Sequence, residues 1–164
     1  VFNADQVEGY EPPPMPESTM TPIETVESLI QATAVTLEHG GDRAYYSPSQ
    51  DLLKMPDIER FPDTESYYAV LMHELTHWTG HKSRCDRTDL KDYAFEELVA
   101  ELGAAFLCAD LGISATPRED HAGYLASWLK ALRDDSKAIF RAASLASKAA
   151  DYITAFGNDK EQAA

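Results

Sequence analysis

The sequence contains few cysteines, no long apolar run and no recognisable secretory signal. Its two cysteines, Cys85 and Cys108, do not form a CxxC pair, which argues against a disulfide scaffold and against a thiolate zinc site. We interpret them as free thiols in a reducing compartment and therefore expect a cytoplasmic protein. No apolar stretch approaches the roughly 18 residues that a membrane helix requires, so no membrane segment is expected.

Basic residues are also scarce, with 14 Lys and Arg against 28 Asp and Glu, and the formal net charge is −14. Because cationic side chains supply most of the affinity for phosphate backbones, we expect no direct nucleic-acid binding by this chain. One local cluster runs against this pattern, and we interpret it as a solvated loop. It comprises Lys82, Arg84, Arg87 and Lys91.

The length of 164 residues fits one domain. Residues 1–20 are rich in proline and are interpreted as a linker or extended arm, and residues 158–164 as a frayed tail. Apolar spacing and turn residues between them predict a mostly helical α+β fold with about five helices and a small β-hairpin. The expected helices cover about 21–38, 64–79, 93–111, 116–132 and 135–156, with Gly157 ending the last, and the hairpin covers about 43–55.

The motif HExxH occupies residues 73–77 of the second predicted helix. Residues four apart on a helix share one face, so His73 and His77 can direct two imidazole nitrogens at one ion. Glu74 points to the side of that ion, where it can take a proton from an activated water without being a ligand. The spacing predicts a metal site with its general base attached.

A catalytic zinc site needs a third protein ligand. His81 lies beyond the predicted end of the helix, and the metzincin ligand position holds Ser83, a poor zinc ligand. The third predicted helix places Glu97 and Glu101 four apart among apolar residues, where carboxylates need a partner. We expect Glu97 to bind the ion and Glu101 to accept a hydrogen bond from a ligating histidine. The reverse assignment is an alternative, as is Glu96.

These motifs resemble a known arrangement. HExxH followed on the next helix by ExxxE is similar to gluzincins, in which glutamate is the third ligand. The stretches YYAVLMHELTHWTGH, FEELVAELGAAFLCADLGI and REDHAGYLASWLKALRDD resemble the metallopeptidase-like C-terminal domain of ArdC-type antirestriction proteins, and related regions of TraC-type plasmid primases. The resemblance covers about residues 40–156.

The resemblance implies a zincin-like metallopeptidase domain over residues 21–157, with zinc held by His73, His77 and Glu97 and with Glu74 as the base. It further implies an N-terminal single-stranded-DNA-binding domain in a longer protein. The segment VFNADQVEGY resembles the junction that follows such a domain.

We therefore predict a zinc-dependent hydrolase, a peptidase acting on a protein or peptide. Manganese, cobalt or nickel also suit two imidazoles and a carboxylate. A hydrolase usually adds a donor for the developing oxyanion. His121 and Tyr124 are candidates on the fourth predicted helix, and Tyr45 and Tyr46 on the hairpin are rivals.

Two other classes of function compete with the hydrolase. In the first, an inherited zincin fold serves as a binding module that blocks a restriction enzyme by contact, its acidic surface imitating the charge of DNA. In the second, the zinc is structural. Structural zinc sites are usually closed and rich in thiolates, whereas this sequence offers three ready ligands and leaves one position open.

Overall fold

The computed structural model describes residues 20–90, 92–114, 135 and 137–161. These residues form a mostly helical α+β fold, which confirms the predicted class. The helices are α1 (Glu24–Thr33), α2 (Thr64–Thr79), α3 (Tyr93–Asp110), α5 (Ala138–Glu161) and the short 3-10 helix η2 (Ile58–Arg60). The strands are β1 (Thr36–His39), β2 (Tyr45–Ser47) and β3 (Leu52–Met55). The predicted linker up to residue 19 and the predicted helix at 116–132 lie outside the described residues.

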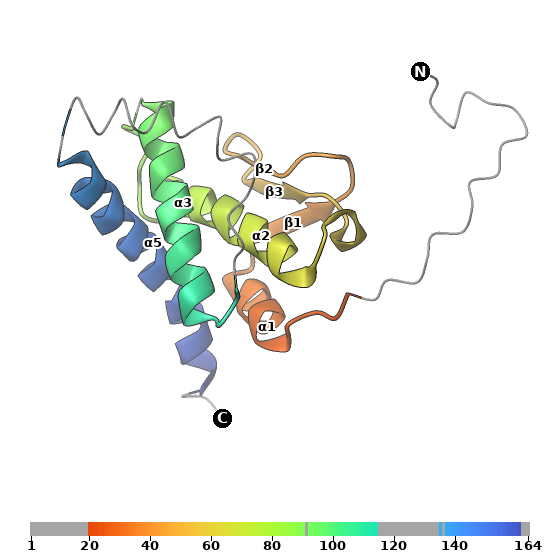
Figure 1. The fold of residues 1–164 in the computed structure, drawn as a ribbon. Helices are drawn as coiled ribbons and strands as arrows, with labels where there is room; N and C mark the ends of the chain where they lie inside the picture. Colours follow the sequence, from red (N-terminus) through yellow and green to blue (C-terminus); the bar gives the residue numbers. More distant parts are fainter. Residues whose placement is uncertain (1–19, 91, 115–134, 136, 162–164) are drawn as a thin grey trace, which may run out of the picture.

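Helix α2 is the centre of the fold and lies between the small sheet and helices α3 and α5 (Figure 1). It is buried on nearly every side, with 11 of its 16 residues in the interior. Asp63 caps its N-terminus by accepting a hydrogen bond from the backbone N–H of Ser66 at 2.7 Å. A helix enclosed in this way also carries its polar residues into the interior, where each needs a partner.

The sheet confirms the predicted hairpin and adds a strand that the sequence analysis missed. Strand β3 is central, paired antiparallel with β2 and parallel with β1. The first helix was predicted to extend to about residue 38, but it ends at Thr33, where Ala34 adopts a left-handed conformation with φ 54°. The hydroxyl of Thr33 then accepts from the backbone N–H of Val35 at 3.3 Å, which helps turn the chain into β1.

Helix α5 is longer than predicted, because it passes through Gly157 and ends at Glu161. The expectation that Gly157 stops the helix is therefore wrong. An isolated glycine costs a helix only about 1 kcal/mol. The packing of α5 against α3 and α1 outweighs that cost. Among the described residues, no helix combines the length and the apolar character of a membrane-spanning segment.

Candidate metal centre

Three predicted side chains converge between α2 and α3. The Nε2 atoms of His73 and His77 lie 3.1 Å apart. The carboxylate of Glu97 places one oxygen 3.3 Å from Nε2 of His77 and the other 3.7 Å from Nε2 of His73. All three residues offer a donor atom within 4.8 Å of one another, and His73 and Glu97 are buried. Among the described residues, this is the one group of three or more histidine, cysteine or acidic side chains that could hold a metal ion.

The spacing of these atoms fits a single divalent cation. Two donors that share a tetrahedral ion at about 2.0–2.1 Å lie about 3.3 Å from each other. The contacts of 3.1 Å and 3.3 Å around Nε2 of His77 match that separation. Two imidazole nitrogens and a carboxylate are also a donor set that zinc and other divalent transition metals accept.

Two further carboxylates lie beside the outer nitrogens of the two imidazoles, on the side away from the convergent donors. Nδ1 of His73 lies 3.1 Å from Oε1 of Glu101, the residue expected on that side, although the pair does not have the geometry of a hydrogen bond. Nδ1 of His77 lies 3.2 Å from Oε1 of Glu96, a contact that the sequence analysis did not assign. A carboxylate on the far nitrogen fixes the ring and directs the near nitrogen inward. The geometry thus gives separate positions to the three glutamates between which the sequence could not decide.

Arg87 is one of two loop arginines whose burial the sequence did not predict. Its side chain is 2% exposed, although it belongs to the cluster interpreted as a solvated loop. The guanidinium holds both oxygens of Glu96, with Nε 3.0 Å from Oε2 and Nη2 2.8 Å from Oε1. It also donates to the hydroxyl of Thr79 and to the carbonyl of Thr76 near the end of α2. Nothing in a polar loop sequence distinguishes such an arginine from a solvated one.

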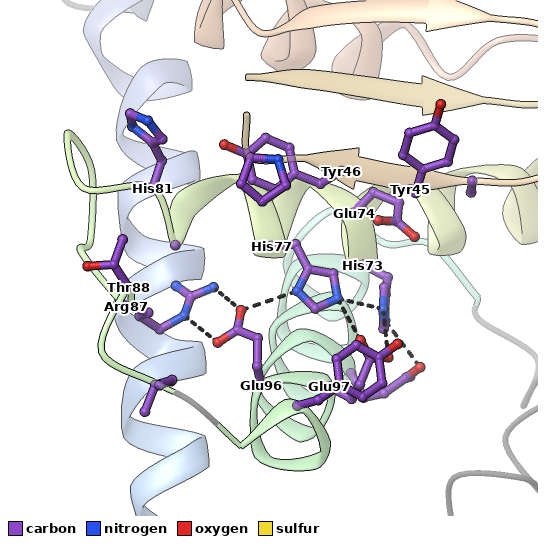
Figure 2. Close-up of a pocket in the computed structure, with 16 residues that line it drawn as sticks. Tyr45, Tyr46, His73, Glu74, His77, His81, Arg87, Thr88, Glu96 and Glu97 are labelled. Atoms are coloured by element: carbon purple, nitrogen blue, oxygen red, sulfur yellow. Dashed lines mark hydrogen bonds and ion pairs between the residues drawn. The ribbon is translucent and has the colours of Figure 1, made fainter. Parts of the chain in front are cut away.

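Glu74 lines the same cavity as the two histidines and is 8% exposed (Figure 2). The cavity has a volume of about 670 Å³, which is within the usual range for small-molecule and peptide sites. Strand β2 forms one wall through Tyr45 and Tyr46, and Tyr93 of α3 also lines the cavity. The cavity is therefore lined by acidic side chains near the histidines and by tyrosines at its mouth, where Tyr93 is 65% exposed.

The electrostatics of the cluster favour added positive charge. Burial lowers the pKa of His73, but the adjacent carboxylates of Glu101 and Glu97 outweigh it and raise that pKa to about 9. Burial also lowers the pKa of His77, but the contacts with Glu96 and Glu97 outweigh this effect, so that pKa is raised. Burial also raises the pKa of Glu74, against the lowering effect of the two histidines. The histidines thus meet four carboxylates and one guanidinium, a balance that a divalent cation would suit.

The other predicted site residues have different outcomes. His81 lines the cavity but turns its Nδ1 to the hydroxyl of Ser83 at 2.8 Å, away from the convergent donors. Tyr46 commits its hydroxyl to Asp51 at 2.7 Å, whereas Tyr45 is 46% exposed at the rim. His121 and Tyr124 lie outside the described residues, so their role stays a prediction.

Arg84 is a second arginine that was expected to be solvated and is not. Its side chain is 7% exposed and forms an ion pair with Asp51 at the turn between β2 and β3. It donates to the hydroxyl of Tyr46 at 3.0 Å and to the backbone carbonyl of Trp78 at 2.6 Å. The hydrogen bonds from Arg84 lower the pKa of Asp51 to about 2. The hairpin is thereby fastened to the end of α2, beside the cavity.

The described residues thus combine a small sheet, a buried HExxH helix and a glutamate of the next helix whose carboxylate reaches both histidines. The family described as zincin-like metallopeptidase matches residues 24–145, and the chain belongs to this family. The family match and the element content together confirm the predicted zincin-like fold.

Relatives and solved structures agree with this assignment. The chain is 46% identical to an uncharacterized protein, y4eC, of Sinorhizobium fredii, matching 99% of the chain and 55% of that protein. It is 45% identical to DNA primase TraC of Escherichia coli over 95% of the chain and 15% of the primase. The Mn(II)-bound crystal structure of antirestriction protein ArdC from plasmid R388 superposes with a TM-score of 0.76 at 42% identity. That match covers 95% of the chain and 60% of ArdC, and the metal-free ArdC structure gives the same TM-score at 43% identity.

The resemblance that the motifs suggested is confirmed by these comparisons. The chain spans about half the length of the S. fredii relative, about three fifths of ArdC and a small part of the primase. The matching region in each relative is therefore one part of a longer protein.

Proposed function

We propose that this chain is a metal-dependent hydrolase that cleaves a protein or peptide. The observation that carries the proposal is the convergence of His73, His77 and Glu97 beside the buried carboxylate of Glu74, at the floor of an open cavity. Zinc is the ion we expect from the donor set, and manganese is its rival because the related ArdC structure is Mn(II)-bound.

Each residue has a distinct part in the proposed reaction. His73, His77 and Glu97 would hold the ion, while Glu101 and Glu96 fix the two imidazole rings. When bound, such an ion lowers the pKa of a coordinated water and polarises a substrate carbonyl. Glu74 accepts the proton of the attacking water and returns it to the leaving amine. Burial raises the pKa of Glu74, which makes it a better proton acceptor than an exposed carboxylate.

The position of β2 supports a peptide as the substrate. Among the strands that the structure describes, β2 is at one edge of the sheet, with β3 on its other side. Tyr45 and Tyr46 of this strand line the cavity that contains Glu74 (Figure 2). An extended peptide can pair with an edge strand through main-chain hydrogen bonds. Its scissile bond would then lie across the convergent donors.

Metal loading is the first test of this function. We expect the metal-free chain to bind one equivalent of Zn²⁺ or Mn²⁺ and to unfold at a higher temperature when loaded. At an ion concentration 100 times Kd the gain is about 2.7 kcal/mol, because only the folded chain brings the three donors together. Calorimetric titration and thermal unfolding measure both quantities.

Cleavage of an unfolded protein such as casein should appear only in the loaded form. A chelator should stop the cleavage, and adding the ion back should restore it. A chain that binds the ion but cleaves neither casein nor a mixed peptide library would contradict the hydrolase proposal.

A contact inhibitor is the second candidate function. The net charge of −14 and the similarity to an antirestriction protein favour it. In this case the chain would inhibit a restriction endonuclease without turnover. The double variant H73A/H77A distinguishes the two functions, because it removes two of the three convergent donors. Inhibition of DNA cleavage that survives in this variant identifies a contact inhibitor, and inhibition that is lost identifies the metal-dependent activity.

The cellular setting is part of the same proposal. We place the chain in the cytoplasm, since a reducing compartment suits the two free cysteines. We further propose that it acts together with an N-terminal single-stranded-DNA-binding domain, as the resemblance to ArdC-type proteins implies. Because this chain is acidic, the other domain would supply the contact with DNA.

A further inference from the structure

Arg87 connects three segments that meet at the candidate metal centre. It belongs to the loop between α2 and α3, yet its guanidinium is enclosed between the end of α2 and the first turn of α3. On α2 it donates to the carbonyl of Thr76 at 2.7 Å and to the hydroxyl of Thr79 at 2.8 Å. On α3 it binds both carboxylate oxygens of Glu96 (Figure 2).

The two-point contact leaves the carboxylate of Glu96 in one orientation. An arginine fork that holds both oxygens fixes the plane of a carboxylate as well as its position. Oε1 of Glu96 is then directed at Nδ1 of His77, 3.2 Å away. With its Nδ1 side occupied, the imidazole presents Nε2 to His73 and Glu97.

Glu96 also precedes Glu97 directly in the sequence, so an unrestrained Glu96 would be a competing ligand. Its carboxylate lies against the ring of His77, and a change of its rotamer would bring it toward the convergent donors. Arg87 occupies both of its oxygens and so keeps it on the outer side of His77. Lysine could supply the same charge but would hold only one oxygen at a time.

We propose that Arg87 is a positioning residue of the metal centre, which clamps Glu96 behind His77 so that Glu97 alone supplies the carboxylate ligand. The proposal rests on the metal site described under the proposed function. In this proposal, a loop arginine determines which of two adjacent glutamates binds the metal. It also explains why so polar a side chain is buried there.

The test is a double-mutant cycle on the whole chain, read out by metal binding. Zn²⁺ and Mn²⁺ are titrated into the metal-free forms of the wild type, R87Q, E96Q and R87Q/E96Q, and the visible spectrum of each Co²⁺ form is recorded. R87Q is expected to bind about 10- to 100-fold more weakly and to show a changed Co²⁺ spectrum, because Glu96 is released toward the ion. In R87Q/E96Q the spectrum should return toward that of the wild type, and the two losses of affinity should combine less than additively.

Arg84→Gln provides the matched control. Arg84 is a similarly buried arginine of the same loop, and its ion pair is made with Asp51 rather than with a glutamate beside the histidines. R84Q should lower the unfolding temperature of the metal-free chain but leave the metal affinity and the Co²⁺ spectrum unchanged. Should R87Q fail to fold, R87K carries the same comparison, with a smaller loss of affinity and the same direction of spectral change.

Two failures are distinguishable. Wild-type protein that takes up none of these ions overturns the proposed metal site itself. Wild-type protein that binds the ion while R87Q binds it equally well, with an unchanged Co²⁺ spectrum, overturns only the role of Arg87. Strictly additive losses in the cycle would also overturn it, because they would show that Arg87 does not act through Glu96.

Discussion

Glu74→Gln is expected to remove hydrolysis while leaving the metal in place. The carboxylate of Glu74 is not among the three convergent donors, so an isosteric amide should retain the ion. An amide cannot accept the proton of the attacking water, and loss of a general base typically slows a reaction about 100- to 10,000-fold. Burial already raises the pKa of Glu74, so a neutral side chain there should not lower the stability of the fold. Casein cleavage at saturating metal, together with calorimetric metal titration, measures both effects.

Glu38→Gln is the control for this prediction. It makes the same chemical change at an exposed glutamate of β1, whose partner is Lys54 at 3.3 Å. Its cleavage rate and metal affinity should equal those of the wild type. An E74Q variant that cleaves at the wild-type rate would show that Glu74 is not the base. One that no longer binds metal would show instead that Glu74 helps to hold the ion.

The parts of this site that the sequence predicted depend on local periodicity. His73 and His77 share a face of α2, and Glu97 and Glu101 share a face of α3, because side chains four apart on a helix are neighbours. The bounds of α2, from Thr64 to Thr79, were predicted from the same pattern and from the turn at residue 80. A helical spacing in one segment thus sufficed to predict which side chains face inward.

The parts that the sequence did not predict depend on contacts between distant segments. Arg84 and Arg87 are buried by ion pairs with Asp51 and Glu96, and neither partner can be identified from a charged loop alone. Strand β1 is stabilised by its parallel pairing with β3, a contact between separate segments that the sequence does not show. The helical spacing of apolar residues in the preceding segment also made residues 36–39 look like a continuation of the first helix. The sequence therefore predicted which side chains converge in the candidate site, but not how the two helices are held in register.

The close approach of α2 and α3 depends on Gly103, and Gly103→Ala should separate the helices at the metal centre. A Cβ at this position would lie 2.5 Å from Cγ2 and 2.7 Å from Oγ1 of Thr76, which is fully buried. Thr76 is on α2 beside His77, and Gly103 follows Glu101 by two residues on α3. The oversized contact therefore acts within one turn of His73 and His77 on α2 and within about two turns of Glu97 on α3. We expect a loss of about 1–3 kcal/mol in stability from overpacking, partly offset by the higher helix propensity of alanine.

The metal affinity of G103A should fall at least about tenfold, because ligand distances tolerate displacements of only about 0.2 Å. Gly157→Ala is the matched control: it also replaces a helical glycine, but its Cβ would meet only Leu29 at an ordinary 3.5 Å. That variant should gain up to about 1 kcal/mol and bind metal as the wild type does. The double variant G103A/T76A removes the two nearest clashing atoms and should recover most of the affinity. If G103A instead behaves like G157A in thermal unfolding and metal titration, helix spacing at Gly103 does not determine the geometry of the metal centre.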